Sequence, residues 1–284
     1  MPERPDAVAY STIANRHLAN QLQVEADGSA WFVSQFTEPG MPLRALGAFH
    51  TTFPPRDPRV ESVFEFAATN ELTRLEPKQV IYREAPPKSV LINRGDITKA
   101  FNSDMEGVFG SPFKELEPLL QKLISELGAF PITSLNFAAR LPAVECRPAE
   151  SCQVDFLFRA AGNSTAGFAN PRFRSEDVEG QISTEIWSDG GNEGAELMLT
   201  LSSHDYELLK GPREAVSSTV PVLELKPGES LRATLKFTIP KWKAGKYVLR
   251  STYSSNCEPP RKGVVIGVFA ADVVAFNITP ASTQ

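Results

Sequence analysis

The stretch LKPGESLRATLKFTIPKWKAGKYVLRSTY, residues 225–253, contains two strand-like runs on either side of a lysine-rich turn. In the first run an apolar residue occupies every second position, at Leu231, Ala233, Leu235 and Phe237. This period of two residues predicts a strand with one buried face and one wet face. The second run, which starts at Tyr247, alternates less cleanly, so its register stays open. A Pro-Gly-Glu turn precedes the first run, and the whole stretch therefore predicts strands joined by turns.

Strand-like runs continue through the second half of the chain at roughly regular spacing. They read SCQVDFLFR, QISTEIWS, AELMLTLS, VPVLEL and VVIGVFAADVVAFNI, with turns rich in Gly, Pro and Asn between them. No helical pattern of useful length interrupts them. Many short strands with such turns are typical of a β-sandwich or barrel. We predict an all-β, immunoglobulin-like sandwich over residues 145–284, with about seven or eight strands.

Two short motifs in this half carry a resemblance to a known family. Pro227-Gly228-Glu229 and Gly245-Lys246-Tyr247 resemble strand-entering turns of bacterial immunoglobulin-like sandwiches, including those of the intracellular proteinase-inhibitor type. The resemblance covers residues 145–280. It implies an immunoglobulin-like fold and, for the function, a protein that inhibits a partner.

The first half mixes strand and helix patterns. A hairpin is predicted around Asp27-Gly28, because this pair accepts positive φ at low cost. A helix is predicted over about 58–72, with Asp57 as its cap, and short strands over 78–84 and 88–94. The absence of a regular βαβ repeat favours an α+β domain over residues 1–142, with an antiparallel sheet and two helices.

The segment SPFKELEPLLQKLISELG, residues 111–128, is the second predicted helix of this half. Ser111 is the expected cap, and Gly128 stands where a left-handed residue would end the helix. Pro118 lacks a backbone N–H, so the helix either kinks there or begins there. The run ITSLNFAARL that follows predicts another strand.

The composition is that of a globular protein. The chain has 284 residues, of which 42% are hydrophobic and 22% charged, and its formal net charge is -5. This mild acidity argues against nucleic acid as a partner, because phosphate binding needs a basic face. No run of about 18 apolar residues occurs, so we predict no membrane span. The oligomeric state stays open.

Three cysteines bear on the compartment without deciding it. Cys146 and Cys152 are close enough in sequence to form a disulfide across a proline-containing turn, or they are two unrelated thiols. Cys257 would then be the odd thiol. A bridge would imply an oxidising compartment, and the N-terminal residues contain no apolar signal core. We favour an extracytoplasmic location with the signal removed over a cytosolic one.

Motifs for chemistry are missing from the sequence. There is no G-x-S-x-G, H-E-x-x-H, paired C-x-x-C, Walker loop or G-x-G-x-x-G, and the three histidines are His17, His50 and His204. His204 and Asp205 are adjacent, so on a strand they would point to opposite faces. We therefore predict no catalytic, cofactor or metal site, and we lean against an enzyme.

Two tryptophans are the predicted partner-binding residues. Trp187 ends a strand beside an acidic loop, and Trp242 lies between Lys241 and Lys243 in a turn. Each ring either packs on the end of the sandwich or stands exposed as an anchor, since Trp is frequent in binding hot spots.

The predicted function is non-catalytic binding. We expect a bacterial protein-recognition protein, of the inhibitor or immunity type, that sequesters a partner protein. The alternatives are a carbohydrate-binding or adhesion module, and a hydrolase with a site between the domains.

Overall fold

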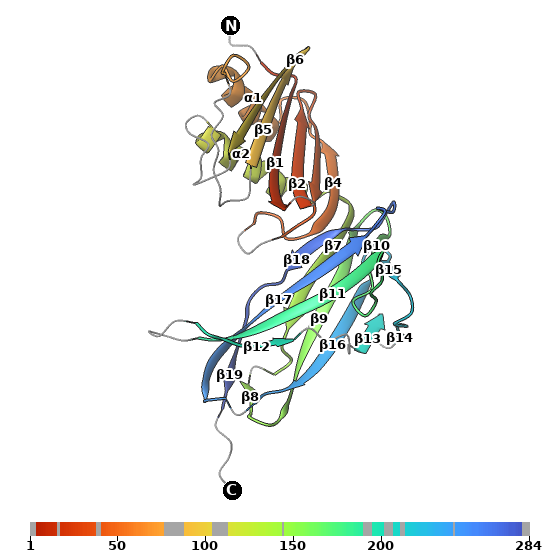
Figure 1. Cartoon of the computed structure of the whole chain (residues 1–284). Coiled ribbons are helices and arrows are strands. Elements are labelled where there is room, and N and C mark those ends of the chain that lie inside the picture. Colours follow the sequence, from red (N-terminus) through yellow and green to blue (C-terminus); the bar gives the residue numbers. More distant parts are fainter. Residues whose placement is uncertain are drawn as a thin grey trace. The chain divides into compact units, whose positions relative to one another are not determined.

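The computed structural model describes residues 4–15, 18–37, 41–76, 88–103, 113–143, 145–189, 195–201, 207–210, 214–240 and 242–279. These residues form mostly strands, in several antiparallel sheets, with two helices (Figure 1). The chain divides into two compact units. The first comprises Met1–Phe36, Met41–Leu43 and Gly47–Ile132, and the second Thr37–Gly40, Arg44–Leu46 and Thr133–Gln284. The domain limits 1–142 and 145–284 stay a prediction.

The first unit is built on one antiparallel sheet with the strand order β4-β3-β2-β1-β5-β6. The strands are β1 (Ala7–Asn15), β2 (Leu18–Glu25), β3 (Ser29–Ser34), β4 (Leu46–Thr52), β5 (Lys88–Arg94) and β6 (Ile97–Ser103). The hairpin predicted at Asp27-Gly28 is confirmed, since β2 and β3 pair across it. Gly28 has a φ of 95°, and a Cβ there would lie 2.5 Å from the carbonyl oxygen of Phe53. Both the turn and the close approach therefore require glycine.

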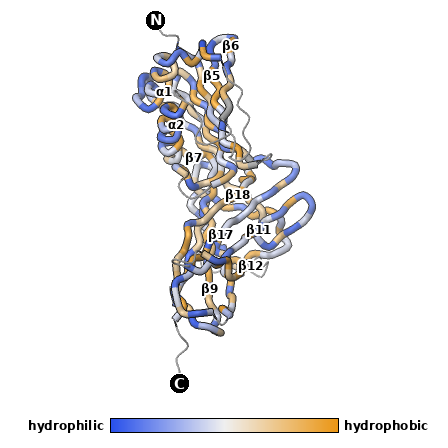
Figure 2. Tube along the Cα trace, turned by 60° about the vertical axis from the view of Figure 1, so that its left-hand side comes forward, coloured by the Kyte–Doolittle hydropathy of each residue, from blue (hydrophilic) through white to orange (hydrophobic). Residues whose placement is uncertain are grey.

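Two helices cover one face of this sheet (Figure 1). They are α1 (Pro58–Thr69) and α2 (Phe113–Leu127). The tube in Figure 2 changes repeatedly between orange and blue along them, as expected for helices with one apolar stripe. The buried residues of these stripes are Val60, Val63, Phe64 and Ala67 in α1, and Leu116, Leu120, Leu123, Ile124 and Leu127 in α2. Among the residues described, neither helix is long and apolar enough to cross a membrane.

The ends of α2 differ from the prediction. The helix runs through Pro118, so the alternative in which it begins there is wrong. Ser111, the expected cap, and the strand predicted over 78–84 lie outside the described residues. Gly128 does not have the predicted left-handed conformation. A Cβ at Gly128 would lie 2.8 Å from a methyl carbon of Leu43, at the end of a side chain that can shift, and 3.0 Å from the carbonyl oxygen of Ser125.

Asp57 caps α1 as predicted. Its Oδ1 accepts the backbone N–H of Arg59 at 2.9 Å, and its Oδ2 lies 2.6 Å from Nη2 of the same arginine. The guanidinium of Arg59 also lies over the ring of Phe53, 4.5 Å from its centroid. Chiefly because the Arg59 side chain donates to the carboxylate, the pKa of Asp57 falls from 3.8 to about 2.

Acid is therefore expected to remove the contribution of the Asp57 charge. The folded pKa lies below the unfolded one, so the ionised carboxylate stabilises the fold above pH 3.8, and this contribution is lost as the pH falls to about 2. Asp57→Asn keeps a capping oxygen without the charge. We expect its melting temperature to lie below that of the wild type at pH 7 and to match it near pH 2. Asp57→Ala also loses the capping oxygen, which should lower the free energy of unfolding by about 1 kcal/mol more. An Asn deficit that is equal at both pH values would contradict this account.

The second unit contains two larger sheets. One has the order β14-β13-β16-β9-β7, and the other β12-β11-β17-β19-β8 with β18 paired to β17. A short pair is formed by β10 and β15. The bounds are β7 (Pro131–Arg140), β8 (Glu145–Cys146), β9 (Ser151–Gly162), β10 (Ala166–Ala169), β11 (Val178–Ser188), β12 (Leu197–Leu201), β13 (Glu207–Lys210), β14 (Glu214–Ala215), β15 (Val222–Leu225), β16 (Ser230–Thr238), β17 (Gly245–Cys257), β18 (Gly267–Ala270) and β19 (Val274–Ile278).

The inner faces of these two sheets share one hydrophobic core. Phe156 and Phe158 of β9, Ile182 of β11 and Tyr253 of β17 are all fully or almost fully buried in the same cluster. The four alternating apolar residues predicted to face inward in β16 are buried as well. The register of β17, which the sequence left open, places Tyr247, Leu249, Ser251 and Tyr253 inward. The hydroxyl of Ser251 is accommodated there by a 3.0 Å hydrogen bond with the hydroxyl of Thr184.

Candidate functional site

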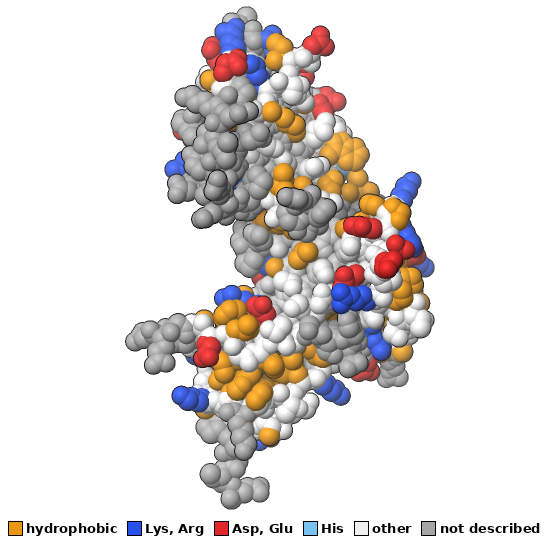
Figure 3. Space-filling model, in the orientation of Figure 1, with side chains coloured by type: hydrophobic (Ala, Val, Ile, Leu, Met, Phe, Trp, Pro, Cys, Tyr) orange, Lys and Arg blue, Asp and Glu red, His pale blue; other side chains and the backbone are white. Residues whose placement is uncertain are grey.

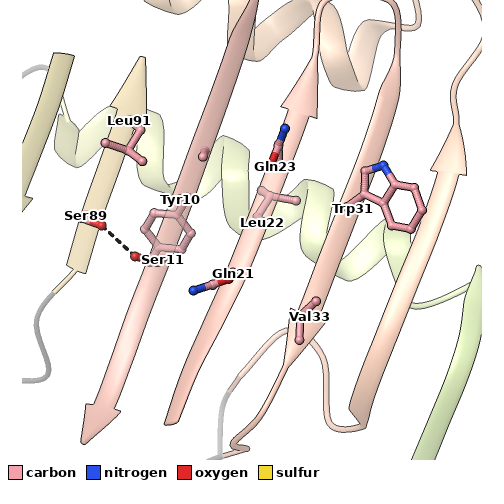
Figure 4. Close-up of a pocket in the computed structure, with 10 residues that line it drawn as sticks. Tyr10, Ser11, Gln21, Leu22, Gln23, Trp31, Val33, Ser89 and Leu91 are labelled. Atoms are coloured by element: carbon pink, nitrogen blue, oxygen red, sulfur yellow. Dashed lines mark hydrogen bonds between the residues drawn. The ribbon is translucent and has the colours of Figure 1, made fainter. Parts of the chain in front are cut away.

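The face of the first unit's sheet that lies opposite the helices carries the candidate site (Figure 4). We call it the open face and define it by two rows of side chains that run across the strands. The first row is His50, Trp31, Gln23, Ala9, Leu91 and Ala100, and the second is Ala48, Val33, Gln21, Ser11 and Ser89. Their neighbours along each strand, such as Leu22 and Phe32, point to the helices and are buried. The open face is thus the side of the sheet that the two helices leave exposed.

Neither row of the open face contains Asp, Glu, Lys or Arg, although such residues make up 22% of the chain. Three large apolar side chains are exposed on it, with exposed fractions of 45% for Trp31, 41% for Val33 and 37% for Leu91. Figure 3 shows hydrophobic and uncharged side chains over the strands of this unit, with both acidic and basic side chains nearer its N-terminal end. Trp31 and Val33 adjoin on β3, while Leu91 is separated from them by the glutamines of β2 and the small residues of β1. Exposed apolar side chains gathered on one uncharged part of a surface are a feature of interaction sites.

Trp31 is held in place by a stacked ring. Its indole and the imidazole of His50 lie with centroids 3.7 Å apart and planes at 24°. His50 Nε2 lies in turn 3.4 Å from the Ser29 hydroxyl. Because one side of the indole rests on its neighbour across the strands, the other side is presented with little loss of rotamer freedom on binding.

The middle of the open face is hollowed. Ala9 and Ser11 are small, and they lie between Trp31 and Val33 on one side and Leu91 on the other (Figure 4). The hollow has a volume of about 300 Å³. The hydroxyls of Ser11 and Ser89 hydrogen-bond each other at 2.7 Å, and the amides of Gln21 and Gln23 line the same hollow. We call this hollow the trough.

A partly buried polar cluster supports the trough from the helix side. The hydroxyl of Tyr10 donates to Glu117 of α2 at 2.7 Å and accepts from Gln121 at 3.0 Å. The same carboxylate binds Nζ of Lys88 at 2.6 Å. Burial, with Glu117 as its acceptor, raises the pKa of Tyr10, so the phenol stays a donor. These bonds tie β1 and β5 to α2 and fix the strands on which the trough lies.

The tryptophans singled out from the sequence lie in the second unit. Trp187 donates from Nε1 to Glu185 at 3.0 Å, and the guanidinium of Arg250 lies 5.3 Å from its ring centroid. Trp242 stacks on Tyr247, with centroids 5.4 Å apart, and packs against the core. Lys243 is exposed, and Lys241 lies outside the described residues. Their role in partner binding stays a prediction.

A second hollow lies on the second unit, beside Trp187. Its volume is about 540 Å³, and Ser183, Glu185, Arg250, Thr252 and Val273 are among its lining residues. It holds one acidic and one basic side chain, so a ligand there would have to replace the hydration of both charges. The trough is smaller but carries no such requirement.

The open face was missed by the sequence reasoning, although a signal for it exists. In β3 the sequence Ser-Ala-Trp-Phe-Val-Ser places Ala30 and Phe32 on the buried side and Trp31 and Val33 on the other. A half-buried strand normally alternates apolar with polar residues. Apolar residues on both sides of one strand therefore indicate a second surface to be covered.

Residues considered for metal or nucleophilic chemistry do not assemble in the described part of the chain. No group of three His, Cys, Asp or Glu side chains that could hold a metal ion occurs among the described residues. His17 and His204 lie outside them. Cys257 is a buried thiol whose Sγ lies 3.7 Å from the carbonyl oxygen of Pro259.

Cys146 and Cys152 are joined by a disulfide, with their Cα atoms 6.1 Å apart. Both are buried in the shared core, Cys146 at the end of β8 in one sheet and Cys152 near the start of β9 in the other. A bridge that closes so short a loop should contribute about 2 kcal/mol to the free energy of unfolding.

We expect the purified chain to be lighter by two hydrogens than its reduced form, and reductant to lower its urea midpoint. The Cys146→Ala, Cys152→Ala double variant should show no response to reductant. A full-mass, reductant-insensitive wild type would contradict the bridge.

No family model matches the chain, and no curated protein matches it. Solved structures with a similar part include a CARDB domain from Pyrococcus furiosus, with 10% identity over 53% of this chain and 96% of that chain and a TM-score of 0.27. A sporulation control protein from Bacillus subtilis has 11% identity over 51% of this chain and 49% of that chain, with a TM-score of 0.27. A family 123 glycoside hydrolase from Clostridium perfringens has 10% identity over 53% and 28%, with a TM-score of 0.29. Likenesses as slight as these support no conclusion about function.

Proposed function

We propose that this chain is a non-catalytic binding protein that holds a partner protein on the open face. The observation that carries the proposal is the exposure of Trp31, Val33 and Leu91 on two rows of side chains that contain no charged residue. The nearest carboxylate on this side of the sheet is that of Glu25, which accepts from the Gln23 amide. Burying uncharged side chains avoids the large desolvation cost of burying ions. A rigid, partly exposed tryptophan is also a frequent anchor of protein interfaces.

The polar groups of the open face are suited to a protein ligand. Amides such as those of Gln21 and Gln23 and hydroxyls such as those of Ser11 and Ser89 both donate and accept hydrogen bonds. The Gln23 amide already donates to Glu25 and the two hydroxyls bond each other, which leaves their remaining donor and acceptor capacity for a ligand. A partner can satisfy them with ordinary polar side chains or with water, and it needs no matching charge. Such a face combines apolar contact area with adaptable polar contacts.

The same proposal includes a two-domain organisation, an immunoglobulin-like type for the second unit, and a bacterial inhibitor or immunity role. The two sheets with a common core support an immunoglobulin-like sandwich. The inhibitor role is supported by the resemblance of Pro227-Gly228-Glu229 and Gly245-Lys246-Tyr247 described above.

Two alternatives each have one observation in their favour. The exposed ring of Trp31 beside two glutamine amides is a feature of sugar sites, although His50 already occupies one side of that ring. A hydrolase is suggested by the contact between Ser29 and His50. Its 3.4 Å exceeds the roughly 2.6–3.2 Å of a nucleophile and its base. We therefore favour the protein partner over both.

The proposal is tested by comparative capture from the source organism's own lysate and secretome. The baits are the wild type, a Trp31→Asp, Val33→Asp variant and a Leu157→Asp control. Leu157 is an apolar residue of β9 with an exposed fraction of 43%, so the control adds a charge at a comparable exposed site. We expect one protein to be held in stoichiometric amount by the wild type and the control and to be lost from the open-face variant. Capture by all three baits alike, or by none, would overturn the proposal.

A further inference from the structure

We infer that the ligand of the open face is an amphipathic α-helix, which lies along the strands in the trough. Its basic end lies at the β2–β3 and β5–β6 turns. This inference rests on the proposed function and names the chemistry of the partner. Three features carry it: the bonding state of the strands, the width of the trough and the charge at one end.

The strands under the trough have no backbone groups to offer a ligand. β1 is hydrogen-bonded to β2 and β5, β2 to β1 and β3, β3 to β2 and β4, and β5 to β1 and β6. An extended segment gains its affinity from main-chain bonds at the edge of a sheet. On this face it would bury its own N–H and C=O groups without partners, which is costly. A helix satisfies its backbone internally and can lie on such a face.

The width of the trough fits a helix. Trp31 and Val33 on β3 and Leu91 on β5 are separated by three strand spacings of about 4.8 Å, or roughly 14 Å in all. A helix with its side chains measures about 10–12 Å across. Ala9 and Ser11 between them are small enough to let it approach, while the larger side chains flank it. On the opposite face α1 and α2 already pack against the same strands (Figure 1).

The charge at one end of the trough sets the direction in which the ligand helix lies. Asp6 precedes β1, Glu25 ends β2, Asp27 lies in the β2–β3 turn and Asp96 in the β5–β6 turn, all at one end of the sheet. Backbone bonds from Asp6 to Asn93 and from Ala26 to Asp6 bring these segments together. Of the bases near this end, Arg4 is bound to both oxygens of Glu61. Arg94 alternates with the buried Val90 and Ile92 of β5 and so lies on the helix side of the sheet. This acidic end favours basic side chains of the ligand and the positive end of its helix dipole.

The inference is tested by selection from a display library of random 18-residue peptides on the full chain. Binders that also hold the Trp31→Asp, Val33→Asp variant are removed. We expect the enriched peptides to carry apolar residues at positions i, i+3, i+4 and i+7, with Lys or Arg gathered toward their N-terminus. Circular dichroism should show them becoming helical on binding.

A charge-reversal cycle tests the direction. Glu25→Lys, Asp96→Lys in the full chain should weaken a selected peptide at least 10-fold. Changing the basic residues of that peptide to Glu should restore binding to the variant, which also shows that the variant folds. Failure of this rescue would overturn the direction.

The outcomes of the selection separate the two proposals. Enriched peptides that depend on Trp31 but lack a helical period would overturn the helix and leave the binding function standing. No enrichment that depends on Trp31 would overturn both. A wild type that sediments as a dimer, with a monomeric open-face variant, would show that a second copy covers the face and would also overturn the helix.

Discussion

Gly180→Ala is expected to lower the free energy of unfolding of the second unit by about 3 kcal/mol or more. Gly180 lies in β11, where a Cβ would meet the carbonyl oxygen of Asn170 at 2.2 Å and its carbon at 2.5 Å. Real Cβ atoms do not approach so closely, and the neighbouring atoms are backbone. The alanine can therefore be accommodated only if one of the two backbones moves.

Asn170 is poorly able to move away from such a Cβ. It is fully buried, and its side-chain amide donates to the carbonyls of Ser217 at 3.0 Å and Val220 at 2.8 Å. Its backbone N–H also donates to the carbonyl of Pro221 at 2.9 Å. A shift of Asn170 would break these bonds in a site that water does not reach.

The measurement is urea unfolding followed by circular dichroism. Gln181→Ala, at the next position of β11, is the matched control and should change the stability by less than about 0.5 kcal/mol. A Gly180→Ala protein as stable as this control would show that the close approach to Asn170 is not present in the molecule.

The second large effect is expected from Trp31→Asp with Val33→Asp. These changes place two carboxylates in rows of side chains that contain no charged residue, and a ligand that covered them would have to strip their hydration. We expect the affinity for the captured protein, or for a selected peptide, to fall at least 100-fold, which is about 3 kcal/mol. Both side chains are partly exposed, and Trp31 also stacks on His50, so we expect the variant to fold with a modestly lower melting temperature.

Titration calorimetry measures this effect, with Leu157→Asp as the control that should bind like the wild type. Unchanged affinity in the open-face variant would move the site elsewhere. A variant whose melting temperature collapses would contradict the exposure of the two side chains.

Much of the second unit could be predicted from the sequence, because its strands bury alternate side chains. The run from Leu231 to Phe237 shows this directly. The register of β17 could not be predicted, since a buried serine breaks the apolar alternation there. Only the pairing of β11 with β17 shows that Thr184 faces Ser251.

The first unit was harder to predict for a related reason. β1 contains small residues such as Ala9 and Ser11, which give little periodic signal but let the trough form. β4, which positions His50 against Trp31, was missed as well. The open face brings together residues from strands as distant in sequence as β1 and β5, and no local sequence pattern predicts that these two strands pair. The sequence therefore points to Trp187 at a strand end and Trp242 in a turn, and gives no comparable signal for Trp31 on the sheet.

The most direct test of the open face is an NMR spectrum of the chain with ¹⁵N-labelled tryptophan. The chain has three tryptophans, so three indole signals are expected, and single Trp→Phe variants assign them. On addition of the captured protein or a selected peptide, the signal of Trp31 should shift while those of Trp187 and Trp242 stay in place. A shift of Trp187 or Trp242 with an unmoved Trp31 would contradict the account.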